Sequence, residues 1–133
     1  MPVPPCAAAG EGAVTFVNRF SLYCSPDEFE QAFAATSAFM GRQPGFLGHT
    51  LLCRADEGNE RQYLNIAWWR DTASFRAAIG HPDFRPHAAA LRALSTSEPN
   101  LYLTRQLRIA PELAAWSASA ASSASSASSR EAR

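Results

Sequence analysis

Two asparagines and one tryptophan are the residues whose type and spacing best suit chemistry. Asn18 lies within an otherwise apolar alternating stretch, residues 14–23, and Asn65 lies within a second one, residues 61–70. Trp69 follows Asn65 by four residues, which on a strand places both side chains on one face. Burying an amide costs about 1 to 3 kcal/mol unless its hydrogen bonds are made. Either these residues are satisfied within the core, or they bind a planar ligand by hydrogen bonds and ring stacking.

His87 and Arg92 form a second group of candidates, on one predicted helix. His87 lies on the apolar face of that helix, where a histidine is either packed and hydrogen-bonded or available as a base or axial ligand. Arg92 is either a solvated surface residue or an anchor for a phenolate or carboxylate. His49, within a strand, and His81, beside a proline in a turn, are weaker candidates. No two histidines are spaced to bind one metal ion from a single element, so we expect no zinc site.

The composition excludes several classes of function. All twelve basic residues are arginine, so Schiff-base chemistry through a lysine is excluded. The sequence contains no GxSxG motif, phosphate loop or dinucleotide fingerprint, and no cysteine with an evident partner base. A net charge of zero provides no basic field for nucleic acid. No apolar stretch approaches the roughly 20 residues of a membrane span. We expect neither nucleic acid nor a membrane as partner.

The chain of 133 residues predicts one domain, residues 13–115, with disordered segments on either side. Residues 1–12 are rich in Pro, Ala and Gly, and residues 116–133 continue into a Ser/Ala tract that cannot bury enough apolar surface to order itself. The N-terminal residues do not have the pattern of a signal peptide. Three cysteines without metal-ligand spacing indicate reduced thiols, and we expect a cytoplasmic protein.

Periodicity and capping residues predict six elements within this domain. In chain order they are a strand over 14–23, a helix capped by Ser25 and stopped by Pro44-Gly45, strands over 46–54 and 61–70, a helical region from Asp71 with a second segment capped by Asp83, and a strand over 100–109. The order β-α-β-β-α-β is typical of the α+β class. It predicts a ferredoxin-like split βαβ fold, a four-stranded antiparallel sheet with helices on one face.

The strand over 61–70 is apolar on both sides, with Leu64, Ile66 and Trp68 opposite the side that carries Trp69. One face of the sheet would therefore expose a large apolar patch in a monomer. We expect two sheets to pack face to face in a homodimer.

Four segments resemble the antibiotic biosynthesis monooxygenase family of the dimeric α+β barrel superfold. They are VTFVNRF at the first strand, Pro44-Gly45-Phe46, NIAWW in the third strand, and FRAAIGHPDFRPH after it. The resemblance covers about residues 13–109 and implies that the sheets pair into a dimeric α+β barrel. Cofactor-independent anthrone monooxygenases of this family use a first-strand Asn, a third-strand Asn and a Trp four residues beyond it. Asn18, Asn65 and Trp69 match all three.

This resemblance implies an enzyme that oxidises an anthrone-type aromatic polyketide to a quinone with O2 and no cofactor. Asn18 and Asn65 would stabilise enolate and peroxide, Trp69 would stack on the rings, and His87 is a candidate base. The substrate-binding residues implied are Phe16, Phe33, Phe75 and Arg92. Some members carry a Tyr where this chain has Phe75, so a role that needs that hydroxyl is missing here.

Two alternatives remain open on the same fold. In the haem-degrading branch Asn18 and His87 match the strand asparagine and the axial histidine, so haem could bind through His87. The tryptophan of that branch falls on Ala78, which leaves ring opening by that route unsupported. A polyketide cyclase or a non-catalytic pocket protein is the other alternative.

Overall fold

The structure, a computed structural model, describes residues 12–56, 58 and 60–116. Residues 1–11 and 117–133, most of the two segments predicted to be disordered, lie outside the described residues. The elements, in chain order, are β1 (Val14–Leu22), α2 (Pro26–Gly41), β2 (Phe46–Cys53), β3 (Gln62–Trp69), α3 (Thr72–Ile79), a 3-10 turn (Pro82–Phe84), α4 (Arg85–Leu94) and β4 (Ser95–Leu103). A helical turn over 111–116 follows, and its Trp116 is largely exposed.

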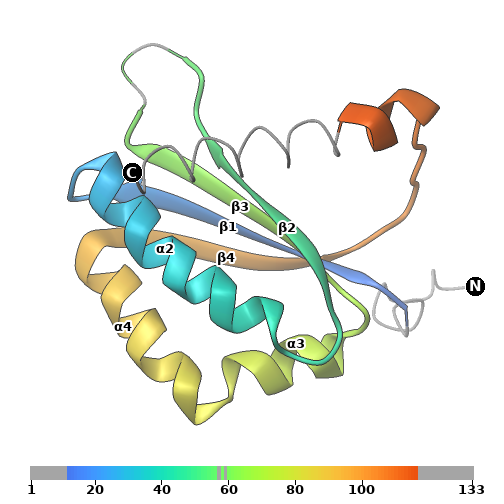
Figure 1. Cartoon of the computed structure of the whole chain (residues 1–133), viewed down its shortest axis with the longest axis horizontal. Coiled ribbons are helices and arrows are strands. Elements are labelled where there is room, and N and C mark those ends of the chain that lie inside the picture. Colours follow the sequence, from blue (N-terminus) through green and yellow to red (C-terminus); the bar gives the residue numbers. More distant parts are fainter. Residues whose placement is uncertain (1–11, 57, 59, 117–133) are drawn as a thin grey trace, which may run out of the picture.

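The four strands form one antiparallel sheet in the order β2-β3-β1-β4. Helices α2, α3 and α4 lie on one face of this sheet (Figure 1). The predicted ferredoxin-like split βαβ fold is therefore confirmed. The central strands β1 and β3 are adjacent, which brings the two asparagine-bearing stretches side by side.

Two clusters of buried side chains fill the space between the sheet and the helices. In the first, aromatic rings of β1, α2 and β3 pack with centroids 5.0 to 5.9 Å apart: Phe20, Phe29, Phe33 and Tyr63. The second lies around α3 and comprises Val14, Ala67, Trp69, Phe75 and Ala78. Both clusters use the same side of β1, which carries Val14, Phe20 and Leu22 at alternating positions.

The predicted caps begin the first two helices. The Ser25 hydroxyl accepts the N–H of Glu28 at 3.3 Å, and Pro26 is the first residue of α2. The Asp71 carboxylate accepts the N–H of Ser74 at 2.7 Å. Hydrogen bonding by the side chain and then by the backbone of Ser74 holds the pKa of Asp71 below its usual value. These caps determine where α2 and α3 begin above the sheet.

The last strand and the last cap differ from the prediction. Strand β4 spans Ser95–Leu103 rather than 100–109, because α4 ends directly before it and the whole segment pairs with β1. Its first half is polar and carries Pro99, which an edge strand tolerates. Asp83 does not cap α4: the His81 ring accepts the Asp83 N–H at 3.0 Å, and α4 begins without a side-chain cap.

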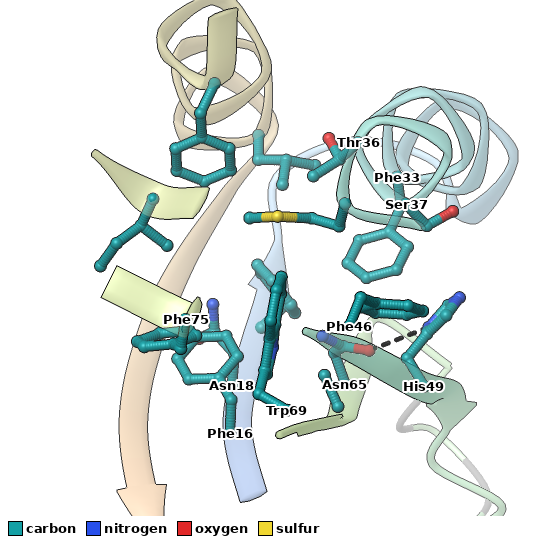
Figure 2. A pocket seen from close by; sticks show the side chains of 16 residues that line it. Phe16, Asn18, Phe33, Thr36, Ser37, Phe46, His49, Asn65, Trp69 and Phe75 are labelled. Carbon is teal, nitrogen blue, oxygen red and sulfur yellow. Dashed lines mark hydrogen bonds between the residues drawn. The ribbon is translucent and has the colours of Figure 1, made fainter. Parts of the chain in front are cut away.

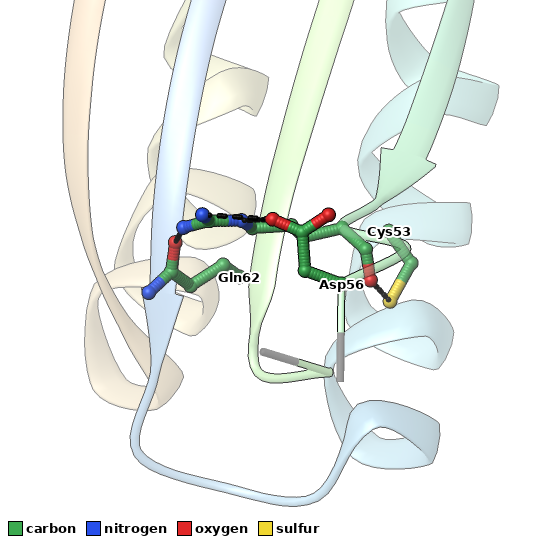
Figure 3. Close-up of polar contacts among 4 residues, drawn as sticks. Cys53, Asp56 and Gln62 are labelled. Atoms are coloured by element: carbon green, nitrogen blue, oxygen red, sulfur yellow. Dashed lines mark hydrogen bonds and ion pairs between the residues drawn. The ribbon is translucent and has the colours of Figure 1, made fainter. Parts of the chain in front are cut away.

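Arg54 lies at the loop end of the β2–β3 hairpin, directly after β2, where Figure 3 shows the polar contacts. Its guanidinium donates to the Asp56 carboxylate at 2.9 to 3.0 Å and to the Gln62 side-chain oxygen at 2.9 Å. Residues 57 and 59 of the predicted turn lie outside the described residues. Exposed contacts of this kind contribute little free energy. They connect the loop to the first residue of β3, at the other end of this strand from Trp69.

Gly45 allows β2 to start close to α3. Its φ is 86°, the left-handed region, and a Cβ there would lie 2.3 Å from Ser74 Oγ and 2.4 Å from Ser74 Cβ. The Gly45 carbonyl accepts the N–H of Arg70 at 2.7 Å. Glycine is therefore required on both steric and conformational grounds.

We predict that Gly45→Ala lowers the free energy of unfolding by about 2 kcal/mol or more, because the left-handed conformation alone costs a β-carbon about 1 to 2 kcal/mol and the clash with Ser74 adds to it. Urea denaturation measures this change. Gly41→Ala is the matched control: nothing lies within 4 Å of a Cβ there, so stability should be unchanged or raised by up to about 1 kcal/mol. Equal stability of the two variants would contradict the assignment.

Candidate functional site

An inner cavity of about 90 Å³ lies between the helical face of the sheet and helices α2, α3 and α4 (Figure 2). Most of its lining is apolar: Phe16, Phe20, Phe33, Met40, Phe46, Ala67, Trp69, Phe75, Ile79, Phe84 and Leu91. Its polar lining consists of Asn18, Thr36, Ser37, His49 and Asn65. The three residues that the sequence singled out, two asparagines and a tryptophan, are therefore brought together.

Asn18 and Asn65 are direct cross-strand partners on β1 and β3. Such partners have Cβ atoms about 4.5 to 5.5 Å apart, so the two amides lie next to each other on the floor of the cavity. Each amide oxygen is already bonded. Asn18 Oδ1 accepts the backbone N–H of Glu98 on β4 at 3.2 Å, and Asn65 Oδ1 lies 3.2 Å from Nδ1 of His49 on β2.

The nitrogen side of both amides is unoccupied. Neither NH2 group donates a hydrogen bond to any described residue, and neither does the indole N–H of Trp69. Two of these side chains are nevertheless buried, since Trp69 is 1% and Asn65 8% exposed. No buried side-chain nitrogen or oxygen among the described residues is both sealed from space and unbonded. These N–H groups therefore face open space, which for two such buried residues is the cavity.

The other polar groups of the lining do not compete for these donors. Thr36 and Ser37 donate their hydroxyl hydrogens back to carbonyl oxygens of α2, at 3.1 Å each. No acidic side chain of the described residues lines the inner cavity. The cavity thus offers hydrogen-bond donors in an apolar surrounding, the arrangement that stabilises an oxygen on which negative charge develops.

Aromatic rings form the walls around these donors. Trp69 contacts Phe46 and Phe75 edge to face, with centroids 5.3 and 5.9 Å apart, and Phe16 lies 4.8 Å from Phe75. Rings arranged in this way leave flat faces for a planar ligand. Phe16, Phe33 and Phe75, predicted as binding residues, all line the cavity.

His49, a weaker candidate from the sequence, lines the inner cavity. A register shift between Phe46 and Gly48 places two residues of β2 opposite one of β3, so both Phe46 and His49 point to the helical face. Strict alternation from Phe46 assigns His49 to the other face. The glycine at position 48 was the available signal, because glycine within a strand is typical of a bulge.

The inner cavity continues into an open outer chamber of about 690 Å³ that is also lined by Phe16, Asn18 and Phe75. Arg76 of α3 and Arg92 of α4 lie in its wall, and neither forms an ion pair with a described residue. No acidic side chain is part of that described wall. Arg92, expected from the sequence to bind substrate, therefore lines the outer chamber, and so does Arg76, which the sequence did not single out.

The structure does not bring His87 to the cavity that Asn18, Asn65 and Trp69 line. Its ring packs against Phe39 of α2 with centroids 5.5 Å apart, and it lines neither the inner cavity nor the outer chamber. Phe84, the last residue of the 3-10 turn, and Leu91 of α4 line the cavity, whereas His87 of α4 packs toward α2. Ala78, the position of the tryptophan in the haem-degrading branch, is 1% exposed within the second core cluster.

Two further findings concern metal ions and membranes. In residues 12–56, 58 and 60–116 no group of three or more His, Cys, Asp or Glu side chains is placed to hold a metal ion. Within the same part of the chain, no helix combines the length and apolar character needed to cross a membrane.

Comparison with known proteins gives consistent results. The profile of the antibiotic biosynthesis monooxygenase family matches residues 25–90. A deoxynogalonate monooxygenase from Streptomyces nogalater is 57% identical over 93 residues, 70% of this chain and 77% of its own length. The crystal structure of SnoaB, described as a cofactor-independent oxygenase from the same organism, superposes with a TM-score of 0.69 at 54% identity, over 72% of this chain and 96% of that one.

A more distant solved structure shows the fold alone. It is described as a putative antibiotic biosynthesis monooxygenase from Caulobacter crescentus, and it superposes with a TM-score of 0.60 at 19% identity, over 74% of this chain and 92% of that one.

We predict that the cavity binds a soluble three-ring aromatic acid, anthraquinone-2-carboxylate, with saturable quenching of tryptophan fluorescence. Ala67→Leu should weaken this binding at least tenfold, because Ala67 lies on the cavity floor and a larger side chain would fill a space of about 90 Å³. Ala34→Leu, the same substitution on the exposed side of α2, serves as control and should bind like the parent chain. Undiminished binding by Ala67→Leu would mean that the ligand binds elsewhere.

Proposed function

The chain belongs to the antibiotic biosynthesis monooxygenase family and is a monooxygenase, and from this premise we propose that it oxidises an anthrone-type aromatic polyketide to a quinone with O2 and without a cofactor. The relatives that support the proposal are named as acting on deoxynogalonate and as cofactor-independent. The observation that carries it is the set of three unpaired N–H donors, from Asn18, Asn65 and Trp69, in an aromatic cavity.

The reaction draws its electrons from the substrate. The methylene carbon of the anthrone loses an acidic proton, and the resulting enolate transfers one electron to O2. The substrate radical and superoxide combine into a peroxide, which takes up a proton. Loss of water, with the second hydrogen of the former methylene, leaves a carbonyl. One substrate and one O2 thus give one quinone and one water.

The three donor groups can stabilise each charged species of this reaction. The NH2 groups of Asn18 and Asn65 stabilise the enolate oxygen as charge develops, and they stabilise the peroxide in the same way. The Trp69 ring stacks on the substrate while its N–H adds a third donor. Because the surrounding wall is aromatic, bulk water is kept from the radical pair.

The two spaces divide the substrate between them. Ligand pockets usually measure about 300 to 1,000 Å³, so the inner cavity accommodates only the reacting edge of a fused-ring molecule and the outer chamber holds the remainder. Arg76 and Arg92 in the wall of the outer chamber favour a substrate with a phenolate or carboxylate at that end.

The position of His87 does not support haem binding through this residue. The axial ligand expected, His87, is packed against Phe39 and lines neither space, and no other histidine extends from α4. A cyclase or a non-catalytic pocket protein would use the same cavity, and the activity assay below distinguishes these from the oxygenase.

We also propose that the chain is a homodimer through the open face of its sheet. In the part of the chain that the structure describes, α2, α3 and α4 cover one face of the sheet (Figure 1). On the other face Trp68 is 40% and Leu52 43% exposed, around the cross-strand partners Ile66 and Val17. An apolar sheet face of this kind is typical of an association surface.

We predict that the purified chain, freed of metal and flavin, consumes one O2 per anthrone oxidised to anthraquinone. Asn65→Ala should lower kcat by about 100-fold, the usual effect of removing an oxyanion donor, and Trp69→Phe, which keeps a ring but removes the N–H, by about tenfold. Oxygen uptake and quinone absorbance measure both.

Trp116→Phe is the control for these variants, because Trp116 lies in the terminal helical turn and lines neither space. Binding without turnover in air would refute the oxygenase and favour a pocket protein. Conversion to a cyclised product without O2 uptake would favour the cyclase.

We predict that the full chain sediments as a dimer and that Ile66→Glu converts it to a monomer, because a charge at the centre of an apolar interface is left unpaired. Ala34→Glu, on the exposed side of α2, should remain dimeric. Sedimentation velocity compares the three proteins. A monomeric parent chain, or a dimeric Ile66→Glu, would argue against this interface.

A further inference from the structure

His49 lies at the solvent side of the inner cavity, next to the buried amide of Asn65. The bulge in β2 turns its ring to the helical face, between Phe33 and Phe46, with ring centroids 5.8 and 6.2 Å away. The ring is exposed to solvent on one side, whereas Asn65 is 8% exposed. The two residues meet through Nδ1 of His49 and Oδ1 of Asn65, 3.2 Å apart.

The direction of this hydrogen bond follows from the chemistry of the two atoms. With the amide oxygen facing the ring, as the structure places it, Nδ1 of His49 must be the donor and hold the proton, because an amide oxygen carries no hydrogen. In the neutral ring Nε2 is then unprotonated. Figure 2 shows the consequence for Asn65: its oxygen is turned to His49 and its nitrogen to the side of Trp69.

The orientation of the Asn65 amide decides whether the site works. With NH2 toward the cavity, Asn65 donates to an anionic oxygen. Rotated by half a turn, it would present its own oxygen and repel that charge. Oxygen and nitrogen of an amide have nearly the same shape, so packing alone does not choose between the two orientations. A neighbouring donor does.

We propose that His49 is a positioning residue whose Nδ1–H holds the Asn65 amide with its NH2 group directed into the cavity. The kinetic consequence rests on the proposed function, and the tautomer of the ring does not. Asn18 is held in the same sense by the backbone N–H of Glu98 at 3.2 Å. In each case a residue of an edge strand orients an amide of a central strand.

The first test is NMR of the neutral imidazole rings in chain labelled with ¹⁵N-histidine. His49 should show a protonated Nδ1 and a bare Nε2, the tautomer that free histidine disfavours. His81 is an internal reference of the opposite kind, because its Nδ1 accepts the Asp83 N–H at 3.0 Å and its Nε2 is therefore protonated. In Asn65→Ala, His49 should revert to the Nε2–H tautomer. Protonated Nε2 in the parent chain would overturn the proposal.

The second test compares two substitutions of His49 by steady-state kinetics. His49→Phe keeps a ring between Phe33 and Phe46 but removes the donor, and should lower kcat about tenfold with little change in KM, since the lost interaction acts on developing charge. His49→Asn places an N–H near the Nδ1 position and should restore most of that loss. In the Asn65→Ala background, His49→Phe should have no further effect.

These outcomes separate positioning from the competing roles of the ring. Equal losses in His49→Phe and His49→Asn would indicate a general base, and additive losses with Asn65→Ala would indicate independent action; either would overturn the proposal. If the chain oxidises no anthrone, the proposed function fails while the tautomer of His49 still decides the inference.

Discussion

The site depends on the antiparallel pairing of Asn18 with Asn65 in the middle of a buried sheet face. Two amides side by side among aromatic rings carry a large desolvation cost if left unbonded. The fold lowers that cost by hydrogen-bonding both amide oxygens, one to the Glu98 N–H and one to the His49 ring. What remains is a pair of N–H donors without protein partners, which is the condition for stabilising an anion that arrives with the substrate.

The division of labour follows the order of the strands. Central strands β1 and β3 carry the amides and the indole, and edge strands β4 and β2 orient the amides. This arrangement requires irregular edges: Pro99 lies opposite Asn18 in β4, and the bulge at Phe46 and Gly48 shifts β2. Local departures from ideal strand geometry are therefore concentrated where the site is built, as expected when function overrides regularity.

The helices stabilise the fold around the cavity through buried side chains and capped ends. Phe29 and Trp69 are almost fully buried in separate aromatic clusters on either side of the cavity, and caps at Ser25 and Asp71 determine where the covering helices start. Because the clusters are packed in the absence of a ligand, the cavity between them is preformed. Ligand binding then requires little free energy for reorganising side chains.

Period-two alternation and capping residues by themselves determined the strands through Trp69, the first two helices, and the shared face of Asn65 and Trp69. These are local signals, readable over a few residues. Three features needed tertiary structure. The bulge that reveals His49 exists only in pairing with β3, the polar strand Ser95–Leu103 forms because β1 pairs with it, and His87 turns toward Phe39 because helical periodicity defines a face but not the neighbour it meets. Each depends on a partner distant in sequence, so the local pattern does not determine it, although Gly48 is a local sign of the bulge.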